Sequence, residues 1–258
     1  MHLNKLIFAT ALSLSAIGAH AALYTSNFGA RAPGYTPNDD GSFGAVALPF
    51  SLNFFGQTYN SLYINNNGNV SFNRSTSAYL SNPLNSQTAA PMIAPFWTDL
   101  DSRADPLGTI AAGTGGSGVY FRQITPSQVV VTWDRLGYYS SNYSGRAQFQ
   151  LVLNDPASTI AATEGVIGFY YGNVTAGTDT HSVSVGFGDG RSTVNAGELS
   201  LYSGSSSFVA AQVMNQSFRY NLDGGIPSVL NTVPEPASLA LSAGALLALS
   251  QLRRRQRA

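Results

Sequence analysis

The chain has 258 residues and no cysteine, and its 13 basic and 13 acidic residues give a formal net charge of zero. Without cysteine, the fold uses neither disulfides nor thiolate metal sites. Residues 22–232 hold eight arginines, no lysine and twelve acidic residues, a net charge of −4, which excludes the clustered cations that nucleic-acid binding requires.

The first 21 residues have the pattern of a secretory signal peptide. Lys5 precedes an apolar run over residues 6–17, and Ala19-His20-Ala21 fits the small-x-small cleavage pattern. We expect cleavage after Ala21 and therefore an exported protein. An N-terminal membrane helix is the alternative, but a run of about a dozen apolar residues is short for a bilayer span.

The rest of the chain reads as one β domain. Residues 22–44 are rich in Gly, Pro and Asp and predict an irregular leader that contributes at most an edge strand. Short segments of β-type composition then alternate with turn residues over residues 45–222. We expect strands ending at Phe54 and over residues 59–64, 69–73, 92–101, 118–122, 128–133, 147–153, 166–171, 182–187, 199–202 and 216–220.

The turn signals indicate how these strands connect. Asn67-Gly68 predicts a hairpin, because both residues tolerate positive φ, and residues 203–207 predict a loop. No segment shows sustained helical periodicity. The pattern therefore predicts an all-β fold, either an antiparallel β-sandwich or a closed barrel.

Several of these segments follow one another in an order that identifies a family. They are Phe54-Phe55-Gly56 and residues 62–72, 94–103, 129–133, 149–153, 167–171 and 185–187. Together they resemble the NIDO domain, the extracellular domain shared by nidogen and by mucin-like and tectorin-like proteins. The resemblance covers residues 45–190. It implies a β-sandwich associated with cell–matrix adhesion and with no known catalysis, although the cysteine-rich and EGF-like neighbours of the animal proteins are missing here.

No group of residues in the chain indicates catalysis. His181 is the only histidine of residues 22–232, and no nucleophile-elbow motif accompanies it. A glycosidase pair would have to use Glu164, Glu198 or the aspartates, and both glutamates lie among turn residues. We therefore name no catalytic residue, and a secreted hydrolase is the second alternative function.

The acidic residues Asp99, Asp101 and Asp105 are a candidate site for a hard cation such as Ca²⁺. In a strand, Trp97, Asp99 and Asp101 would share one face. The spacing lacks the glycine and distal glutamate of a known calcium loop. A structural role, such as an ion pair between Asp101 and Arg103, is the preferred interpretation, and we expect no cofactor, with calcium as the alternative.

Tyr138, Tyr139 and Tyr143 form a second candidate site. They lie in a Ser- and Asn-rich segment that we expect to be a loop between two strands. Exposed tyrosines with such neighbours can stack on sugar rings or contact a protein partner. The alternative is that the rings pack onto the sheet of their own domain.

The C-terminal 26 residues have three parts, after an expected spacer over residues 223–232. Val233-Pro234-Glu235-Pro236 is followed by a mostly apolar run over residues 237–252, and then by Arg253, Arg254, Arg255 and Arg257. Sixteen residues are marginal for a membrane-spanning helix, and the arginines favour the cytoplasmic side. The arrangement resembles the PEP-CTERM sorting signal of Gram-negative bacteria, which implies cleavage by an exosortase.

These patterns together predict an exported, non-catalytic protein of a Gram-negative bacterium. The C-terminal helix would insert transiently into the inner membrane, and the processed protein would act at the cell surface or in the extracellular matrix. The expected partners are the exosortase and then matrix, exopolysaccharide or a surface protein, in cell–matrix adhesion or biofilm association. The first alternative is a carbohydrate-binding module for exopolysaccharide.

Overall fold

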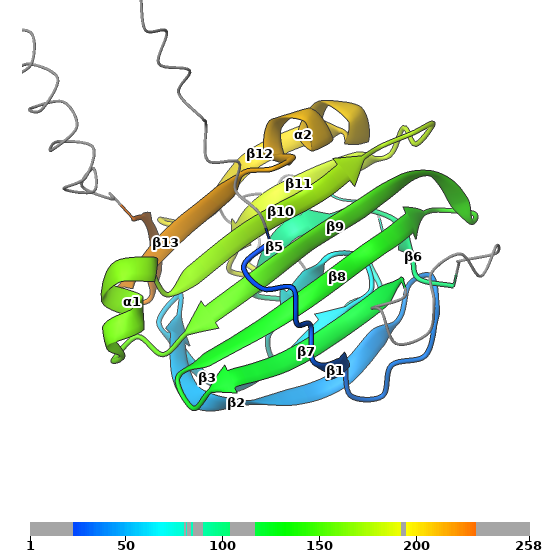
Figure 1. The fold of residues 1–258 in the computed structure, drawn as a ribbon. Coiled ribbons are helices and arrows are strands. Elements are labelled where there is room, and N and C mark those ends of the chain that lie inside the picture. The colour runs from blue at the N-terminus through cyan, green and yellow to red at the C-terminus, as the bar shows by residue number, and fades with distance from the viewer. Residues whose placement is uncertain are drawn as a thin grey trace, which may run out of the picture.

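Two antiparallel sheets make up the fold in the computed structural model, which describes residues 23–79, 81, 84, 90–103, 117–191 and 195–230 (Figure 1). The first sheet has the order β1-β7-β8-β9-β10-β13-β14, with β6 paired to β8. Its strands are β1 (Ala30–Arg31), β6 (Leu100–Asp101), β7 (Gly118–Thr125), β8 (Gln128–Tyr138), β9 (Asn142–Asn154), β10 (Ile167–Thr175), β13 (Ser217–Asp223) and β14 (Ile226–Val229).

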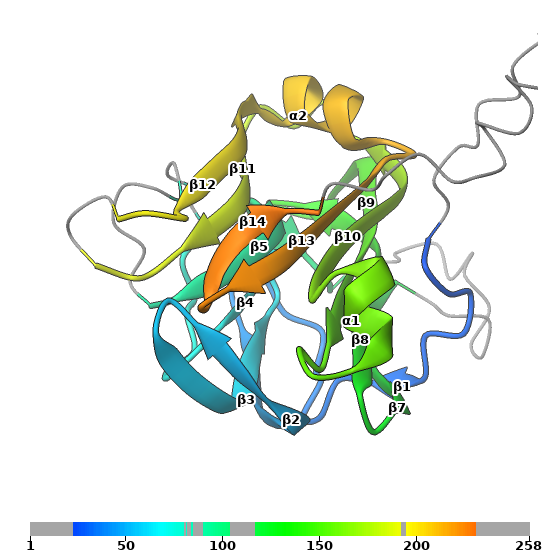
Figure 2. The same ribbon diagram turned by 90° about the vertical axis from the view of Figure 1, so that its left-hand side faces the viewer.

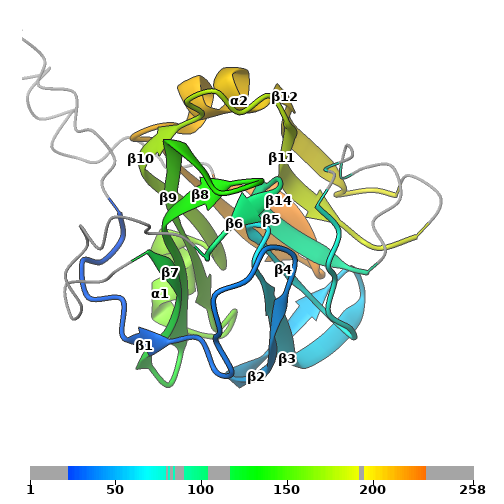
Figure 3. The ribbon, with the colours of Figure 1, turned by 90° about the vertical axis from the view of Figure 1, so that its right-hand side faces the viewer.

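The second sheet has the order β12-β11-β5-β4-β3-β2. Its strands are β2 (Ser42–Phe54), β3 (Gln57–Asn65), β4 (Asn69–Ser71), β5 (Met92–Trp97), β11 (Ser182–Gly188) and β12 (Leu199–Ser205). The sheets face each other as two layers (Figure 3). Within the described part of the chain no strand of one sheet pairs with the other, so the sandwich prediction is confirmed over the closed barrel.

Aromatic side chains fill the space between the sheets. Trp133 of β8 stacks on Phe149 of β9 with ring centroids 5.1 Å apart, and Phe96 of β5 reaches the same ring at 5.5 Å. Phe169 of the first sheet stacks on Phe187 of the second at 5.4 Å. Such rings bury large apolar areas, and they stabilise the sandwich without disulfides.

Two short helices are an addition to the predicted fold. Helix α1 (Thr159–Glu164) begins at Ser158, whose hydroxyl accepts from the amide of Ala161, and it ends at Gly165 with φ of 80°. Helix α2 (Ser206–Val213) begins at Ser205, within the segment expected to be a loop. With six and eight residues, both are too short to show helical periodicity in the sequence. Helix α2 contacts β10 of one sheet and β11 and β12 of the other, and covers that side of the sandwich (Figure 2).

The C-terminal part of the domain extends further than predicted. Gly224 and Gly225, expected to begin a spacer, form the turn of a hairpin between β13 and β14, with φ of 62° and 90°. The carbonyl of Gly225 accepts from the amide of Phe55 at 2.8 Å, which ties the turn to the other sheet. In a sequence, a Gly-Gly pair suits a tight hairpin turn, which needs positive φ, and it suits a flexible linker equally well. The sequence pattern alone does not separate these two cases.

The predicted leader is also part of the sandwich. Strand β1 pairs with β7 as the expected edge strand, and β2 begins at Ser42, three residues before the predicted domain boundary. Residues 23–31 run across the outer face of the first sheet (Figure 1). The predicted signal peptide, with Ala19 and Ala21, lies outside the described residues, as does the tail with Val233, Pro234, Glu235, Pro236, Arg253, Arg254, Arg255 and Arg257.

Candidate functional site at the loop end of the sandwich

Five segments meet at one end of the sandwich, which we call the loop end: residues 38–41, 66–68, 98–103, 139–141 and 178–181. Hydrogen bonds and one ring contact link these segments in series. The amide of Asn66 donates to Gly41 O at 2.8 Å, that of Thr98 to Asn67 O at 3.3 Å, and that of Tyr139 to Asp99 O at 3.1 Å. The Tyr139 ring lies 5.5 Å from the His181 ring. The loop end therefore contains Asp99, Asp101, Tyr139 and His181 from among the candidate residues of the sequence analysis.

Two of the segments that carry the family resemblance, residues 62–72 and 94–103, contact each other here. Gly68 lies at the turn between β3 and β4 with φ of 76°, and a Cβ on it would lie 1.9 Å from Phe96 O. The side chain of Asn67 accepts from the amide of Leu100 at 2.9 Å. Only glycine fits such a close backbone approach. These motif residues therefore hold the turn of one hairpin against the strand that follows it.

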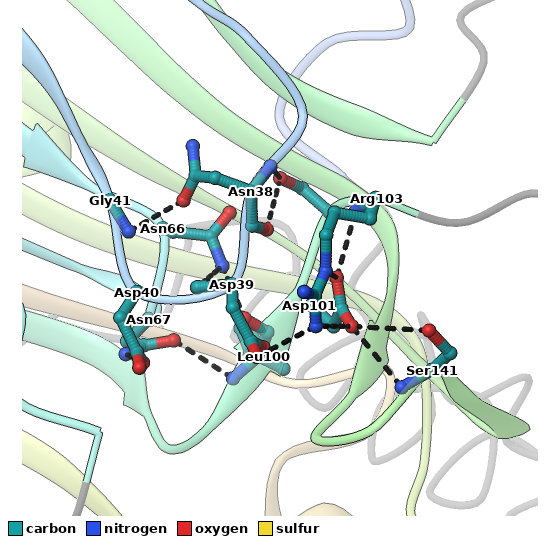
Figure 4. A network of polar contacts seen from close by, with 11 residues as sticks. Asn38, Asp39, Asp40, Gly41, Asn66, Asn67, Leu100, Asp101, Arg103 and Ser141 are labelled. Atoms are coloured by element: carbon teal, nitrogen blue, oxygen red, sulfur yellow. Dashed lines mark hydrogen bonds and ion pairs between the residues drawn. The ribbon is translucent and has the colours of Figure 1, made fainter.

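Buried asparagines extend this framework. Asn66 donates from Nδ2 to Asp39 O and to Leu100 O, and Asn67 donates to Asp40 Oδ1 at 2.9 Å (Figure 4). The carbonyl of Asn65 accepts from the Trp133 indole at 3.0 Å. Sequence reasoning identified the Asn-Gly turn but did not connect it with Asp39 and Asp40. Those two aspartates precede Gly41 in a turn-like segment, which is the one signal the sequence offers.

Asp101 has the structural role that was preferred for it. Arg103 donates from Nε to Asp101 Oδ1 at 3.0 Å and from Nη2 to Oδ2 at 2.8 Å, and Ser141 N adds a bond at 3.1 Å (Figure 4). Burial by itself would raise the pKa of Asp101, but the hydrogen bonds and charge of Arg103 outweigh it and lower that pKa. Arg103 also pairs with Asp39 at 2.7 Å. Asp105 lies outside the described residues.

Asp99 has no such partner among the described residues. It is 3% exposed, and its buried Oδ1 forms no hydrogen bond with the part of the chain that the structure describes. Burial, and then the charges of Asp40 and Asp39, raise its pKa from 3.8 to about 6, while His181 acts in the opposite direction. A buried carboxylate without donors is costly in its charged form. Asp99 is therefore the electrostatically strained member of the loop end.

The predicted shared face of Trp97, Asp99 and Asp101 is wrong. The chain leaves the second sheet after Trp97 and enters the first sheet at Leu100, so the alternation of a single strand is broken at Thr98 and Asp99. The Trp97 indole bonds Ala78 O at 2.9 Å, within a separate small cluster. Among the described residues no three His, Asp or Glu side chains are grouped closely enough to hold a metal ion.

The tyrosine segment is a tight hairpin rather than a loop. Tyr138 ends β8 and pairs with Asn142 of β9. The Tyr138 side chain is fully buried. Burial raises the pKa of its hydroxyl, and the charge of Asp179 raises that pKa further. Tyr143 packs its ring under the Arg146 guanidinium at 4.6 Å. Of the three, only Tyr139, which is 52% exposed, offers a ring to a partner.

The remaining ionisable candidates are held in local contacts. His181 Nδ1 lies 2.6 Å from Asp179 Oδ1, and the Asp179 side chain is buried. Glu164 ends α1 and pairs with Arg219 at 3.2 Å. Glu198 accepts from the amides of Asp189 at 3.0 Å and Asn195 at 2.6 Å, and so shapes its own loop. The two glutamates belong to different elements and different local networks.

Both helices of the described domain, α1 and α2, are short. Within the described ranges, no helix is long and apolar enough to cross a bilayer. The apolar run over residues 237–252 lies outside those ranges.

Comparisons with known proteins agree with this framework. A family described as NIDO related matches residues 16–223. The chain is similar to alpha-tectorin of Mus musculus, with 30% identity over 155 residues, 54% of this chain and 7% of that protein. It is also similar to nidogen of Drosophila melanogaster, with 27% identity over 133 residues, 45% of this chain and 10% of that protein.

A third similar protein is the dendrite extension defective protein 1 of Caenorhabditis elegans, with 35% identity over 83 residues, 32% of this chain and 6% of that protein. The chain thus spans a tenth or less of the length of these three relatives. No solved structure matches it.

Proposed function

The chain belongs to the NIDO-related family, and we propose that it is an exported, non-catalytic domain that acts in cell–matrix adhesion. The match over residues 16–223, which takes in β1 to β13, carries this proposal. The similar proteins include an alpha-tectorin and a nidogen, and the NIDO resemblance implies an extracellular adhesive role. The loop end supports the non-catalytic part of this proposal, because most of its polar side chains form hydrogen bonds with neighbouring residues of the same framework.

The loop end is the contact surface in this proposal, and the position of the C-terminal exit supports that choice. Leu230 bonds Arg219 O of β13, and Arg219 lies opposite Gly168 at the start of β10. His181 follows the other end of β10. With about 3.3 Å per strand residue, the C-terminal exit and the His181 segment of the loop end are separated by about 20 Å along the sheet. A tether at the C-terminal exit would leave Tyr139 free to meet a partner.

Binding of the domain to matrix from its own host tests this surface. Residues 22–232 would be added to purified matrix, with Tyr139→Ser as the probe and Val229→Ser as the control. Val229 is 65% exposed and lies on β14, away from the loop end. We expect Tyr139→Ser to weaken binding at least fivefold at unchanged melting temperature. Equal binding by the two variants would reject the loop end as the contact surface.

We further propose that the protein is sorted in a Gram-negative host. The signal peptide would direct export, the segment Val233-Pro234-Glu235-Pro236 would be recognised by an exosortase, and the arginine-flanked apolar run would anchor the precursor until cleavage. The tripartite order of the tail supports this. Fractionation of host cells with and without the exosortase, with mass spectrometry of both mature ends, tests it. An uncut tail at the surface of wild-type cells would reject exosortase sorting.

A carbohydrate-binding module for exopolysaccharide is the second candidate, and the surroundings of Tyr139 favour it. Next to the exposed ring, Asn142 Nδ2 donates to Thr178 Oγ1 at 3.1 Å, and Ser144 N and Oγ donate to Asn142 Oδ1 at 3.2 and 2.7 Å. Hydroxyls and amides beside an aromatic ring suit sugar recognition. Retention on protease-treated exopolysaccharide, lost in Tyr139→Ser, would select this function. Loss of all binding after protease treatment would select a protein partner.

A further inference from the structure

Residues 23–31 form a strap, which we call the N-terminal strap, across the outer face of the first sheet (Figure 1). At its start, the ring of Tyr24 lies 5.1 Å from that of Tyr170 on β10. At its other end, β1 pairs with β7 and Ala32 N donates to Val119 O at 3.0 Å. The strap therefore passes over β10, β9 and β8 before it joins the sheet edge.

The sheet holds the strap through built contacts rather than by chance packing. Buried Gln150 accepts from the amide of Thr25 at 3.1 Å and donates to Thr25 O at 2.9 Å, which imitates the pairing of a neighbouring strand. Gln128 donates to the Tyr24 hydroxyl at 2.8 Å. Gly29, at φ of 78°, lies where a Cβ would be 2.8 Å from Arg122 Cβ. The strap is thus fitted to this face in both its backbone and its side chains.

These contacts link residues that are far apart in the chain. Thr25 and Gln150 are separated by 125 positions, and the face that receives the strap requires β7 to β10 to be assembled. Closing such a long loop is possible only after those strands have paired. The first residues of the exported chain are therefore among the last to reach their folded positions.

The predicted signal-peptidase bond, between residues 21 and 22, lies within two residues of this docked segment. Two extended residues reach about 7 Å. A peptidase binds residues on both sides of the bond in its cleft, so cleavage of a folded precursor requires the strap to open locally. Resting on the predicted signal peptide of the proposed function, we propose that the docked strap shields the signal-peptidase bond, so that the signal peptide must be removed before the strap docks.

Cleavage of purified precursor by signal peptidase in detergent tests the proposal. Three precursors would be compared: the folded wild type, Gln150→Leu, which removes both bonds to Thr25, and Gly68→Val, which prevents the sandwich from closing. Gln148→Leu is the matched control, because Gln148 lies on the same strand and bonds Asp134 Oδ1 at 2.7 Å instead of the strap. Hydrogen exchange at the amides of Thr25 and Ala32 gives a second, independent readout.

We expect folded precursor to be cut at least tenfold more slowly than Gly68→Val, with Gln150→Leu at least threefold faster than Gln148→Leu. The Thr25 and Ala32 amides should be protected from exchange in folded precursor, because the strap docks there when the signal peptide is retained. Equal cleavage rates for folded and unfolded precursor, or unprotected Thr25 and Ala32 amides in folded precursor that is cut slowly, would overturn the proposal. If Gln150→Leu does not fold, the wild-type comparison and the exchange data decide. If unfolded precursor is not cut after Ala21, the predicted signal peptide itself fails.

Discussion

Asp99→Asn should stabilise the domain at neutral and alkaline pH. The carboxylate is buried, its Oδ1 has no hydrogen-bond partner within the described ranges, and the charges of Asp40 and Asp39 act on it. An amide keeps the shape of the side chain and removes the charge. The substitution therefore isolates the electrostatic cost of the residue at the point where the chain crosses between the sheets.

The size and sign follow from the pKa of Asp99. Because that pKa rises from 3.8 to about 6 on folding, and each pKa unit is worth about 1.4 kcal/mol, ionisation costs the folded state about 3 kcal/mol. Because the pKa is raised, Asp99 does not lower the free energy of unfolding below pH 3.8, where it is protonated in both states. This free energy falls as the pH rises, and the loss is complete once the pH has passed through about 6. The stability difference between Asp99→Asn and wild type should therefore grow from near zero at pH 3.5 to between about 1 and 3 kcal/mol at pH 8.

Urea unfolding at half-unit pH steps measures this difference, and Asp223→Asn, at an exposed carboxylate on the β13–β14 hairpin, serves as the control. Asp101 and the other acids titrate in both proteins, so only the difference between the two curves is diagnostic. A variant less stable than wild type at pH 8 would refute the reasoning, because it would mean that the Asp99 carboxylate has a stabilising partner in solution. If EDTA then also lowered the wild-type melting temperature, that partner would be a divalent cation.

Three further predictions concern the loop end. EDTA should leave the melting temperature of the wild type unchanged, and a drop of several degrees would restore calcium as a ligand of the acidic residues. Arg103→Ala should lower the free energy of unfolding at pH 7, because it leaves the buried Asp101 carboxylate without its main partner. The loss should shrink as the pH falls and Asp101 becomes protonated, which occurs below the ordinary carboxyl range because Arg103 lowers the pKa of Asp101; an equal loss at every pH in urea titrations would contradict the ion-pair explanation. Tyr138→Ser should cost at least about 3 kcal/mol and Tyr139→Ser less than about 0.5 kcal/mol, so similar losses in thermal melts would show that the two rings are not divided between core and surface.

The strand pattern and the central hairpin were predictable because their signals are local. Alternation ending at Phe54 and the Asn67-Gly68 pair both depend on neighbours in the sequence, and the structure confirms β2 and the pairing of Ile64 with Val70. The ion pair between Asp101 and Arg103 was predictable for the same reason, because the two residues are only two positions apart. Local backbone preferences and short-range ion pairs are the part of the fold that a single sequence expresses directly.

Features set by distant contacts could not be predicted in the same way. Whether Gly224-Gly225 is a linker or a turn depends on Phe55 of the other sheet, which bonds it. Tyr138 and Tyr139 are neighbours of the same type, yet one is buried and the other is half exposed, because β8 runs to Tyr138, five residues beyond the predicted end at residue 133. The strain on Asp99 also arises from Asp39 and Asp40, which are some 60 positions away.

The distribution of these features separates the family's framework from the surface that we propose meets a partner. The segments that identify the family, around Gly68 and Phe96, are buried and hold two hairpins and two sheets together. Residues 64–72 and 94–102 of these segments are all buried, so they leave little surface with which to select a ligand. The turn that follows Tyr138 has the opposite character, since Ser140 and Ser141 adopt positive φ and Tyr139 points its ring outward. Family likeness therefore accounts for the sandwich and the position of the loop end, and under the proposed function the residues at the tip of the β8–β9 hairpin would determine what this protein binds.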